Sequence, residues 1–176
     1  MIKFRFNAEK AIAYVAERVR LEGRVDSQAL FGTLYLADKE HLLDWGRTVF
    51  GGDYEAEVIG PVHVQVRQML NGDPAHLCAA GLDVYPWRTE GRWIMSQPGA
   101  AAPDVLMLLS HSDVRALRVA RHGAYESLQK NPLRDRALHD AAWSKARGGR
   151  ILFEDIALEA GIELDVADTD AWHILT

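Results

Sequence analysis

The sequence predicts a mainly α-helical protein of the α+β class, a compact domain of about six helices with one small antiparallel β-hairpin. Three observations lead to this prediction. Apolar residues recur at three- and four-residue spacing in several long stretches, which is typical of amphipathic helices. Capping residues and glycines stand at the ends of these stretches. One stretch instead carries β-forming residues on both sides of a short turn.

The first helix is predicted at 8–22. Asn7 can cap its first turn, and Gly23 can end it because glycine tolerates the left-handed conformation that follows a last helical turn. One apolar stripe runs along the helix, made of Ala8, Ile12, Val15 and Val19. The stripe predicts one buried face.

The second helix is predicted at 27–45, with Ser27 as its cap and Gly46 as its stop. Its spacing places Trp45 on the apolar side, so we expect this indole to be substantially buried, as we do for Trp143. The charged side of the helix is expected to include Asp38.

Residues 62–71 fit two patterns. Alternating valines favour a strand, whereas Pro61 before the segment and Gly72 after it favour a helix, which we predict. The hairpin is predicted at 82–96 around a Thr-Glu-Gly turn, and Pro86 requires its own strand to lie at an edge.

Three further helices are predicted at 111–123, 135–147 and 153–160. The first of them begins with Ser110 and Asp113 at capping-box positions, and Val114 is expected on its buried stripe. Gly123 is expected to interrupt or end it. Two glycines follow the second of these helices.

The length of 176 residues predicts one domain, at 1–150, with a short helix and an acidic extension at 151–176 packed on it or trailing from it. The single Cys78 excludes an internal disulfide. No apolar run approaches the ~20 residues that cross a membrane, and the N-terminus lacks the apolar core of a signal peptide. We expect a cytoplasmic protein that makes no membrane contact.

The sequence carries no enzyme signature. Seven histidines are present, but no two stand four residues apart as on a metal-binding helix, and no phosphate-binding loop occurs. The sequence therefore predicts no catalytic, cofactor-binding or metal-binding residue, and no cofactor.

Charge is unevenly distributed along the chain. The formal net charge of −5 makes nucleic acid an unlikely partner. Nevertheless, residues 115–150 hold nine basic and three acidic residues, whereas 151–176 hold seven acidic and no basic residues other than histidine. Arg115 and Arg118 share one helical face. This face is either a solvated surface or a site for an acidic partner.

One block of the sequence resembles a known family. Leu34–Asp38 reads Leu-Tyr-Leu-Ala-Asp, and the chain continues through a glycine-rich segment and Ala56 to Gly60-Pro61-Val62. The block resembles the SocA-like antitoxin domain, also called the Panacea domain. Weaker similarities follow in the Leu-Ser-x-x-Asp of 109–113 and in His139 and Trp143. The resemblance covers about residues 7–147.

The resemblance implies an antitoxin that neutralises a cognate toxin by direct protein binding. Some family members also deliver the toxin to a protease, and relatives occur in prophages. The expected partners are thus a small toxin encoded nearby and a cellular protease. Family-motif or partner-binding candidates are Tyr35, Asp38, Gly60, Pro61, Val62, His139, Trp143, Arg115 and Arg118.

Two points remain open from the sequence. The motif residues either hold the fold together or touch a partner, with Tyr35 and Asp38 expected near the Gly60-Pro61 corner. The chain departs from the family pattern at 31–33 and at 63–67. The alternative function is a DNA-binding or regulatory helical protein, which the basic segment favours and the net charge opposes.

Overall fold

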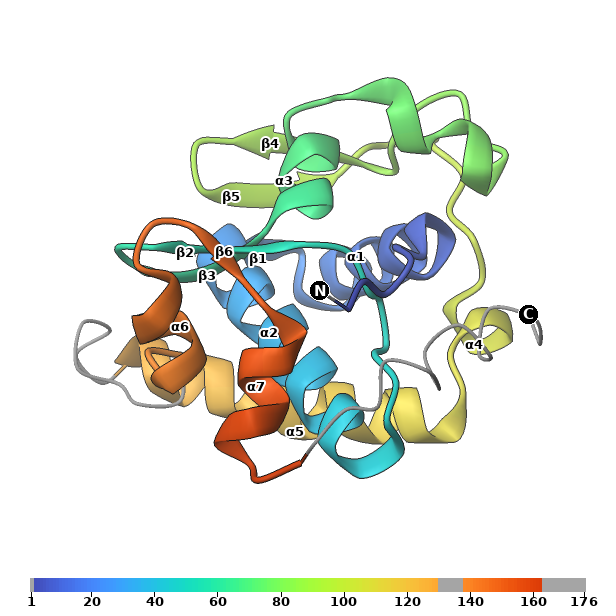
Figure 1. Ribbon diagram of the computed structural model, residues 1–176. Coiled ribbons are helices and arrows are strands. Elements are labelled where there is room, and N and C mark those ends of the chain that lie inside the picture. The colour runs from blue at the N-terminus through green and yellow to red at the C-terminus, as the bar shows by residue number, and fades with distance from the viewer. Residues whose placement is uncertain (1, 130–137, 163–176) are drawn as a thin grey trace.

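The computed structural model describes residues 2–129 and 138–162, and it has a mainly helical α+β architecture (Figure 1). The α-helices are α1 (Ala8–Glu22), α2 (Ser27–Trp45), α3 (Val64–Leu70), α4 (Val105–Leu108), α5 (His111–Gln129), α6 (Ala141–Ala146) and α7 (Phe153–Glu159). The strands are β1 (Arg24–Asp26), β2 (Tyr54–Glu57), β3 (Gly60–His63), β4 (Trp87–Glu90), β5 (Trp93–Ser96) and β6 (Arg150–Ile151). They form two three-stranded antiparallel sheets in the described part of the chain, ordered β1-β5-β4 and β3-β2-β6.

The two N-terminal helices confirm the predicted bounds. Asn7 caps α1 by accepting a hydrogen bond from the Lys10 N–H at 3.0 Å. The predicted Ser27 cap of α2 is wrong, because Asp26 accepts the Gln28 N–H instead. The backbone N–H of Ser27 is already directed at the carbonyl of Arg92, 2.9 Å away, so strand pairing decides where α2 begins.

The predicted hairpin is confirmed as β4 and β5, but it begins at Trp87 and not at residue 82. The expected Thr-Glu-Gly turn is wrong, because Thr89 and Glu90 pair with Ile94 and Trp93, and the turn is made by Gly91 and Arg92. Gly91 has φ +59°, which suits the first position of a type II′ turn. Pro86 precedes β4, and β4 lies at an edge of its sheet as predicted. The third strand, β1, was not predicted. Its three residues are too few to show an alternation pattern.

The predicted helix at 62–71 is correct only from residue 64. Val62 pairs with Glu55 in β3, and Pro61 pairs with Ala56, so Pro61 does not occupy the first turn of a helix. The cap of α3 is His63, whose ring nitrogen Nδ1 accepts the Val66 N–H. Residues 62 and 63, expected as the helix start, therefore belong to β3. The sheet β3-β2-β6 was not part of the predicted fold.

Helix α5 confirms the predicted capping box. Asp113 accepts the Ser110 N–H at 2.9 Å, and the Ser110 hydroxyl accepts the Asp113 N–H at 3.2 Å. The expected end at Gly123 is wrong, since α5 continues to Gln129. The absent side chain permits close packing on α2, because a Cβ at Gly123 would lie 3.3 Å from Leu36. Val114 is not on the buried stripe, which runs through Ala116, Leu117, Ala120 and Ala124.

The C-terminal helices are shorter than predicted. Helix α6 begins only at Ala141, because Asp140 caps it through the Trp143 N–H; residues 135–137 lie outside the described residues. Helix α7 confirms the prediction for 153–160 to within one residue. It buries Phe153, Ile156 and Ala157, while 163–176 lie outside the described part.

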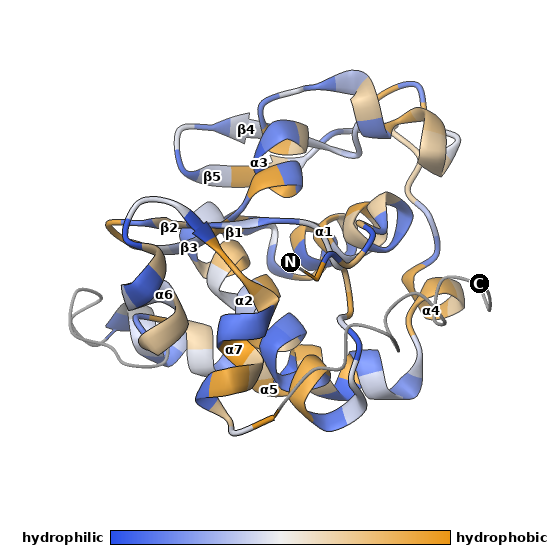
Figure 2. Ribbon diagram, in the orientation of Figure 1, coloured by the Kyte–Doolittle hydropathy of each residue, from blue (hydrophilic) through white to orange (hydrophobic). Residues whose placement is uncertain are grey.

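Helix α2 lies at the centre of the molecule, beside α5 and against β3, with α6 and α7 on the adjoining side (Figure 1). The buried residues of α2 face several directions. The short helix α4 lies at the surface and consists of apolar residues only (Figure 2). The expected burial of Trp45 is wrong: the residue is 60% exposed in the last turn of α2. Trp143 is half-buried.

Gly60→Ala should lower the free energy of unfolding by about 1–3 kcal/mol. Gly60 has φ +131°, which L side chains rarely adopt, although a Cβ would meet nothing nearer than Leu138 at 3.8 Å. The cost is therefore backbone strain rather than a clash. Urea denaturation of Gly60→Ala and of the wild type measures this cost. Equal stability of Gly60→Ala and wild type would contradict strain at this corner.

Candidate functional site

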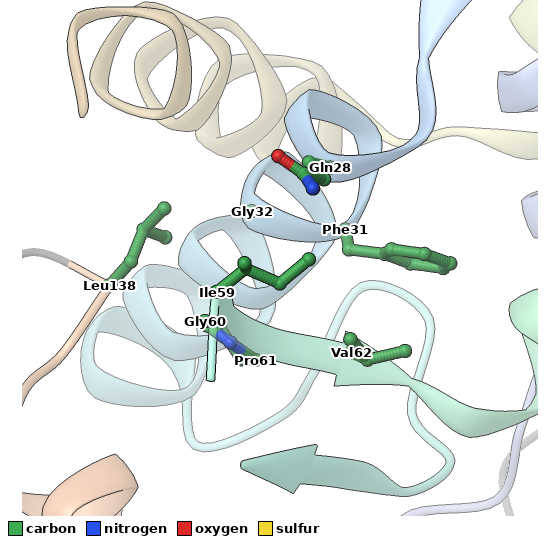
Figure 3. A pocket seen from close by; sticks show the side chains of 8 residues that line it. All are labelled: Gln28, Phe31, Gly32, Ile59, Gly60, Pro61, Val62 and Leu138. Atoms are coloured by element: carbon green, nitrogen blue, oxygen red, sulfur yellow. The ribbon is translucent and has the colours of Figure 1, made fainter. Parts of the chain in front are cut away.

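The family-motif candidates come from four separate segments, which are α2, the hairpin β2–β3, α5, and the stretch that leads into α6. Gly60, Pro61 and Val62 form one corner of the structure, against residues of α2 and Leu138. Figure 3 shows this corner: Gly60 and Pro61 begin β3 below α2, and Leu138 approaches from the other side. The corner is therefore a tertiary arrangement of residues that are far apart in the sequence.

Asp38 is fully buried, contrary to its expected place on the charged side of α2. One carboxylate oxygen accepts the N–H groups of Val49 and Phe50, each at 2.8 Å, and the other accepts the Tyr54 hydroxyl at 2.9 Å. Burial raises the pKa of Asp38 to about 7, although these hydrogen bonds oppose the rise. Asp38 binds backbone N–H groups as expected, but in the loop before β2 and not at Gly60.

Tyr35 is also fully buried, and its hydroxyl donates to Asp140 at 2.7 Å rather than reaching the Gly60 corner. Asp140 also accepts Lys39 Nζ at 2.7 Å. Burial and the neighbouring Asp140 carboxylate raise the pKa of Tyr35 well above its ordinary value. The contact ties α2 to the start of α6.

Asp140 is a residue whose role was missed in the sequence. It joins α2 and α6 through three hydrogen bonds, from Tyr35, Lys39 and the Trp143 N–H. A local signal existed, because Asp140 stands three residues before Trp143 at the start of a helix, as an N-cap does. The prediction of a helix from residue 135 placed Asp140 inside the helix and not at its N-cap.

A small hollow lies at the Gly60-Pro61-Val62 corner. Its wall is apolar apart from one amide, and it is lined by Gln28, Phe31, Gly32, Ile59, Gly60, Pro61, Val62 and Leu138 (Figure 3). The space open to water-sized molecules is about 10 Å³, which admits roughly one water. Small-molecule sites are far larger. Beside it, the hairpin tip exposes Val58 at 77% and Ile59 at 40%.

His139 and Trp143 form an aromatic pair next to the corner. Their ring centroids lie 4.2 Å apart in an edge-to-face arrangement. The Trp143 indole N–H donates to the carbonyl of Glu57 at 3.0 Å, which joins α6 to strand β2. Both ring nitrogens of His139 are buried without a hydrogen-bond partner in the described structure. The pair is thus part of the packing between α6 and the sheet.

Arg115 and Arg118 are not brought to this corner. Both are exposed on α5, and neither forms an ion pair within residues 2–129 and 138–162. Burial and the neighbouring Asp44 raise the pKa of Glu40 on α2, and the charge of Arg115 opposes this rise. The two arginines therefore form a separate surface from the motif corner.

A second buried polar cluster joins α1, α2 and α5. Asp113 accepts Lys10 Nζ at 2.9 Å and lies 3.3 Å from both His41 Nε2 and Arg47 Nη1. Burial alone would raise the pKa of Asp113, but the hydrogen bonds from Lys10 and the Ser110 N–H hold it below its usual value. His41 also contacts the carbonyl of Arg47 at 2.8 Å. The cluster fixes the start of α5.

Within residues 2–129 and 138–162, no three His, Cys, Asp or Glu side chains are grouped as metal ligands. The same residues include no helix that is long and apolar enough to cross a membrane.

Comparison with protein-family models, curated proteins and solved structures finds no match for this chain. The arrangement of the corner must therefore be interpreted from its own geometry. Its motif residues are mainly buried, and their polar groups bind other parts of the same chain.

Asp38→Asn should change how stability depends on pH. Because burial raises the pKa of Asp38 from 3.8 to about 7, the contribution of this group to stability is fully present below the unfolded pKa of 3.8 and is lost as the pH rises towards and through 7. Asparagine cannot ionise. Relative to Asp38→Asn, the wild type should thus lose about 3 kcal/mol between pH 4 and pH 7.

Urea denaturation of both proteins at pH 4, 5, 6 and 7 measures this difference. Burial lowers the pKa of His63 to about 3, so His63 acts in the opposite direction, but it is present in both proteins and cancels. A difference that stays flat or grows in favour of the wild type as the pH rises would mean that the three hydrogen bonds outweigh burial.

Proposed function

We propose that this chain is an antitoxin-like interaction protein that neutralises a small toxic partner by direct and stable binding, without catalytic turnover. The proposal starts from the Leu34–Val62 block and its resemblance to the SocA-like antitoxin domain. The toxin is expected to be encoded nearby. The adaptor form of the proposal adds a cellular protease that receives the bound toxin.

One structural observation supports the proposal more than the others. The residues that carry the resemblance are joined by their polar groups: Tyr35 to Asp140, and Asp38 to Tyr54. Trp143 also joins two elements, because its indole N–H donates a hydrogen bond to the carbonyl of Glu57 in strand β2. These hydrogen bonds explain why the motif residues occur together in the sequence, because each of them holds two elements of the fold together.

The same observation assigns roles within the proposal. Tyr35, Asp38, Gly60, Pro61 and Val62 are buried, so we infer that they hold the fold and do not touch the toxin. Contact with the partner falls to exposed residues on this scaffold. Arg115 and Arg118 remain candidates because they are exposed cations.

Protection from the toxin should require roughly equimolar protein, because each antitoxin molecule occupies one toxin molecule. The measurement is co-expression of this chain with each flanking gene product at graded ratios, followed by growth assay and co-purification. Full protection at a small fraction of the toxin level would indicate a catalyst and contradict the proposal.

Two further arms separate the alternatives. Protection that disappears in a strain lacking one protease, while binding is retained, would support the adaptor form. The finding that neither flanking product is toxic, together with tight DNA binding that weakens steeply with salt, would replace this proposal with the DNA-binding alternative.

A further inference from the structure

The sheet β1-β5-β4 has one covered face and one open face. The covered face carries Val25, Trp87 and Ile94, which are 1–5% exposed and belong to the core. On the same face, the Thr89 hydroxyl donates to the carbonyl of Leu70 at the end of α3. Side chains alternate along a strand, so the neighbouring residues must point to the opposite face.

We call this opposite face the Trp93 face. The strand register places six side chains on it: Arg24, Asp26, Arg88, Glu90, Trp93 and Met95. Arg24 and Met95 are directly opposed, as are Asp26 and Trp93. Trp93 and Met95 are half-buried, while Arg24, Arg88 and Glu90 are exposed.

Two guanidinium groups lie against the Trp93 ring. The central carbon of Arg24 is 4.4 Å from the ring centroid, and that of Arg92, in the hairpin turn, is 5.4 Å away. Stacking of this kind holds an arginine in place through a cation–π interaction and leaves the N–H groups at the edge of its plane free to donate.

The charges on the face are mostly paired. Arg92 donates to Asp26 from Nε at 2.7 Å, and Arg88 pairs with Glu90. Arg24 forms no ion pair with any residue that the structure describes. The face therefore presents one cation that is oriented by an aromatic ring and not neutralised, next to the apolar surface of Trp93 and Met95.

We propose that the Trp93 face docks an acidic segment of a protein partner. A carboxylate of that segment accepts hydrogen bonds from the edge of Arg24, and a neighbouring apolar side chain lies against Trp93 and Met95. The chemistry fits because tryptophan, methionine and arginine are the residue types that protein interfaces favour. The inference holds whether or not the partner is a toxin.

A protein segment fits this face better than a nucleic acid does. Aromatic rings with arginines also bind single strands, but such sites follow the backbone with a groove of several cations. Here Asp26 and Glu90 lie among the arginines and would repel successive phosphates. One unpaired arginine matches one carboxylate.

The face also fits better than the surface of α5. Arg115 and Arg118 are exposed, but neither guanidinium is stacked on a ring in the described structure. Binding would have to immobilise both flexible side chains, whereas Arg24 is already held. Strands β4 and β5 lie far from α5 (Figure 1), whereas Val25 of β1 lines a hollow together with Arg121 and Tyr125 of α5.

The test is an NMR titration of the full chain, labelled with ¹⁵N, using three probes. The first is a capped ten-residue peptide of alternating glutamate and leucine. The second has glutamine in place of every glutamate, and the third is a ten-nucleotide oligothymidylate. The readouts are the indole N–H signal of Trp93 and the backbone amides of β1 and β5.

We expect the acidic peptide to shift these signals in a saturable manner, with affinity at least about tenfold higher than that of the glutamine peptide. Arg24→Gln should remove most of this difference without disturbing the fold, because Arg24 is exposed. The matched control Arg118→Gln should retain it. Trp93→Phe, which keeps a ring, should bind with intermediate affinity.

Several results would overturn the inference. Equal binding of the acidic and glutamine peptides would show that Arg24 does not select a carboxylate. Loss of binding in Arg118→Gln but not in Arg24→Gln would move the site to α5. Tighter binding of oligothymidylate than of the acidic peptide to the same signals would make the face a nucleic-acid site. No shift of the Trp93 signal with any probe would leave no docking site there.

Discussion

The buried carboxylate of Asp38 is the interaction on which the rest of the structure depends. A carboxyl group without exposure to water needs hydrogen-bond donors, and Asp38 obtains them from Val49, Phe50 and Tyr54. The chain after α2 must therefore turn back over the helix and place Tyr54 beneath it. Tyr54 begins β2, the middle strand of sheet β3-β2-β6, so the position of this sheet follows from the same contact.

Helix α2 distributes this constraint to the other elements. One turn before Asp38, the Tyr35 hydroxyl reaches Asp140 and sets the start of α6. One turn after it, His41 lies 3.3 Å from Asp113 at the start of α5. Three successive turns of one helix thus hold three other parts of the chain. This explains why the helix is buried on most sides.

The burial of these residues separates fold from recognition. Tyr35, Asp38 and the Gly60 corner have their polar groups directed inwards, so replacing them would act first on stability. Arg24, which is exposed, and the half-buried Trp93 lie on sheet β1-β5-β4, apart from the hydrogen bonds of Asp38 and Tyr35. Replacing either of these two side chains leaves those buried hydrogen bonds in place, whereas Asp26 on the same face also caps α2.

Local signals in the sequence were sufficient for α1, α2, the start of α5, α7 and the β4–β5 hairpin. In each case the deciding interactions join residues close in the chain, as in the capping box of Ser110 and Asp113. The functional candidates Tyr35, His139 and Trp143 were also found from sequence, but their contacts were not. Asp140, which accepts hydrogen bonds from the Tyr35 hydroxyl and the Trp143 N–H, was missed.

Only the tertiary structure decided the short strands and the burial of single side chains. Strands β1 and β6 have three and two residues, and their hydrogen bonds go to segments far away in the chain, as when Tyr54 pairs with Ile151. No local pattern records such a partner. Pro61 suggested a helix start, but the chain turns back after Glu57 and Pro61 pairs with Ala56 in the short β2–β3 hairpin. Asp38 was expected to be exposed but is buried, and Trp45 was expected to be buried but is exposed. Burial depends on what packs against a helix, whereas periodicity describes only the helix itself.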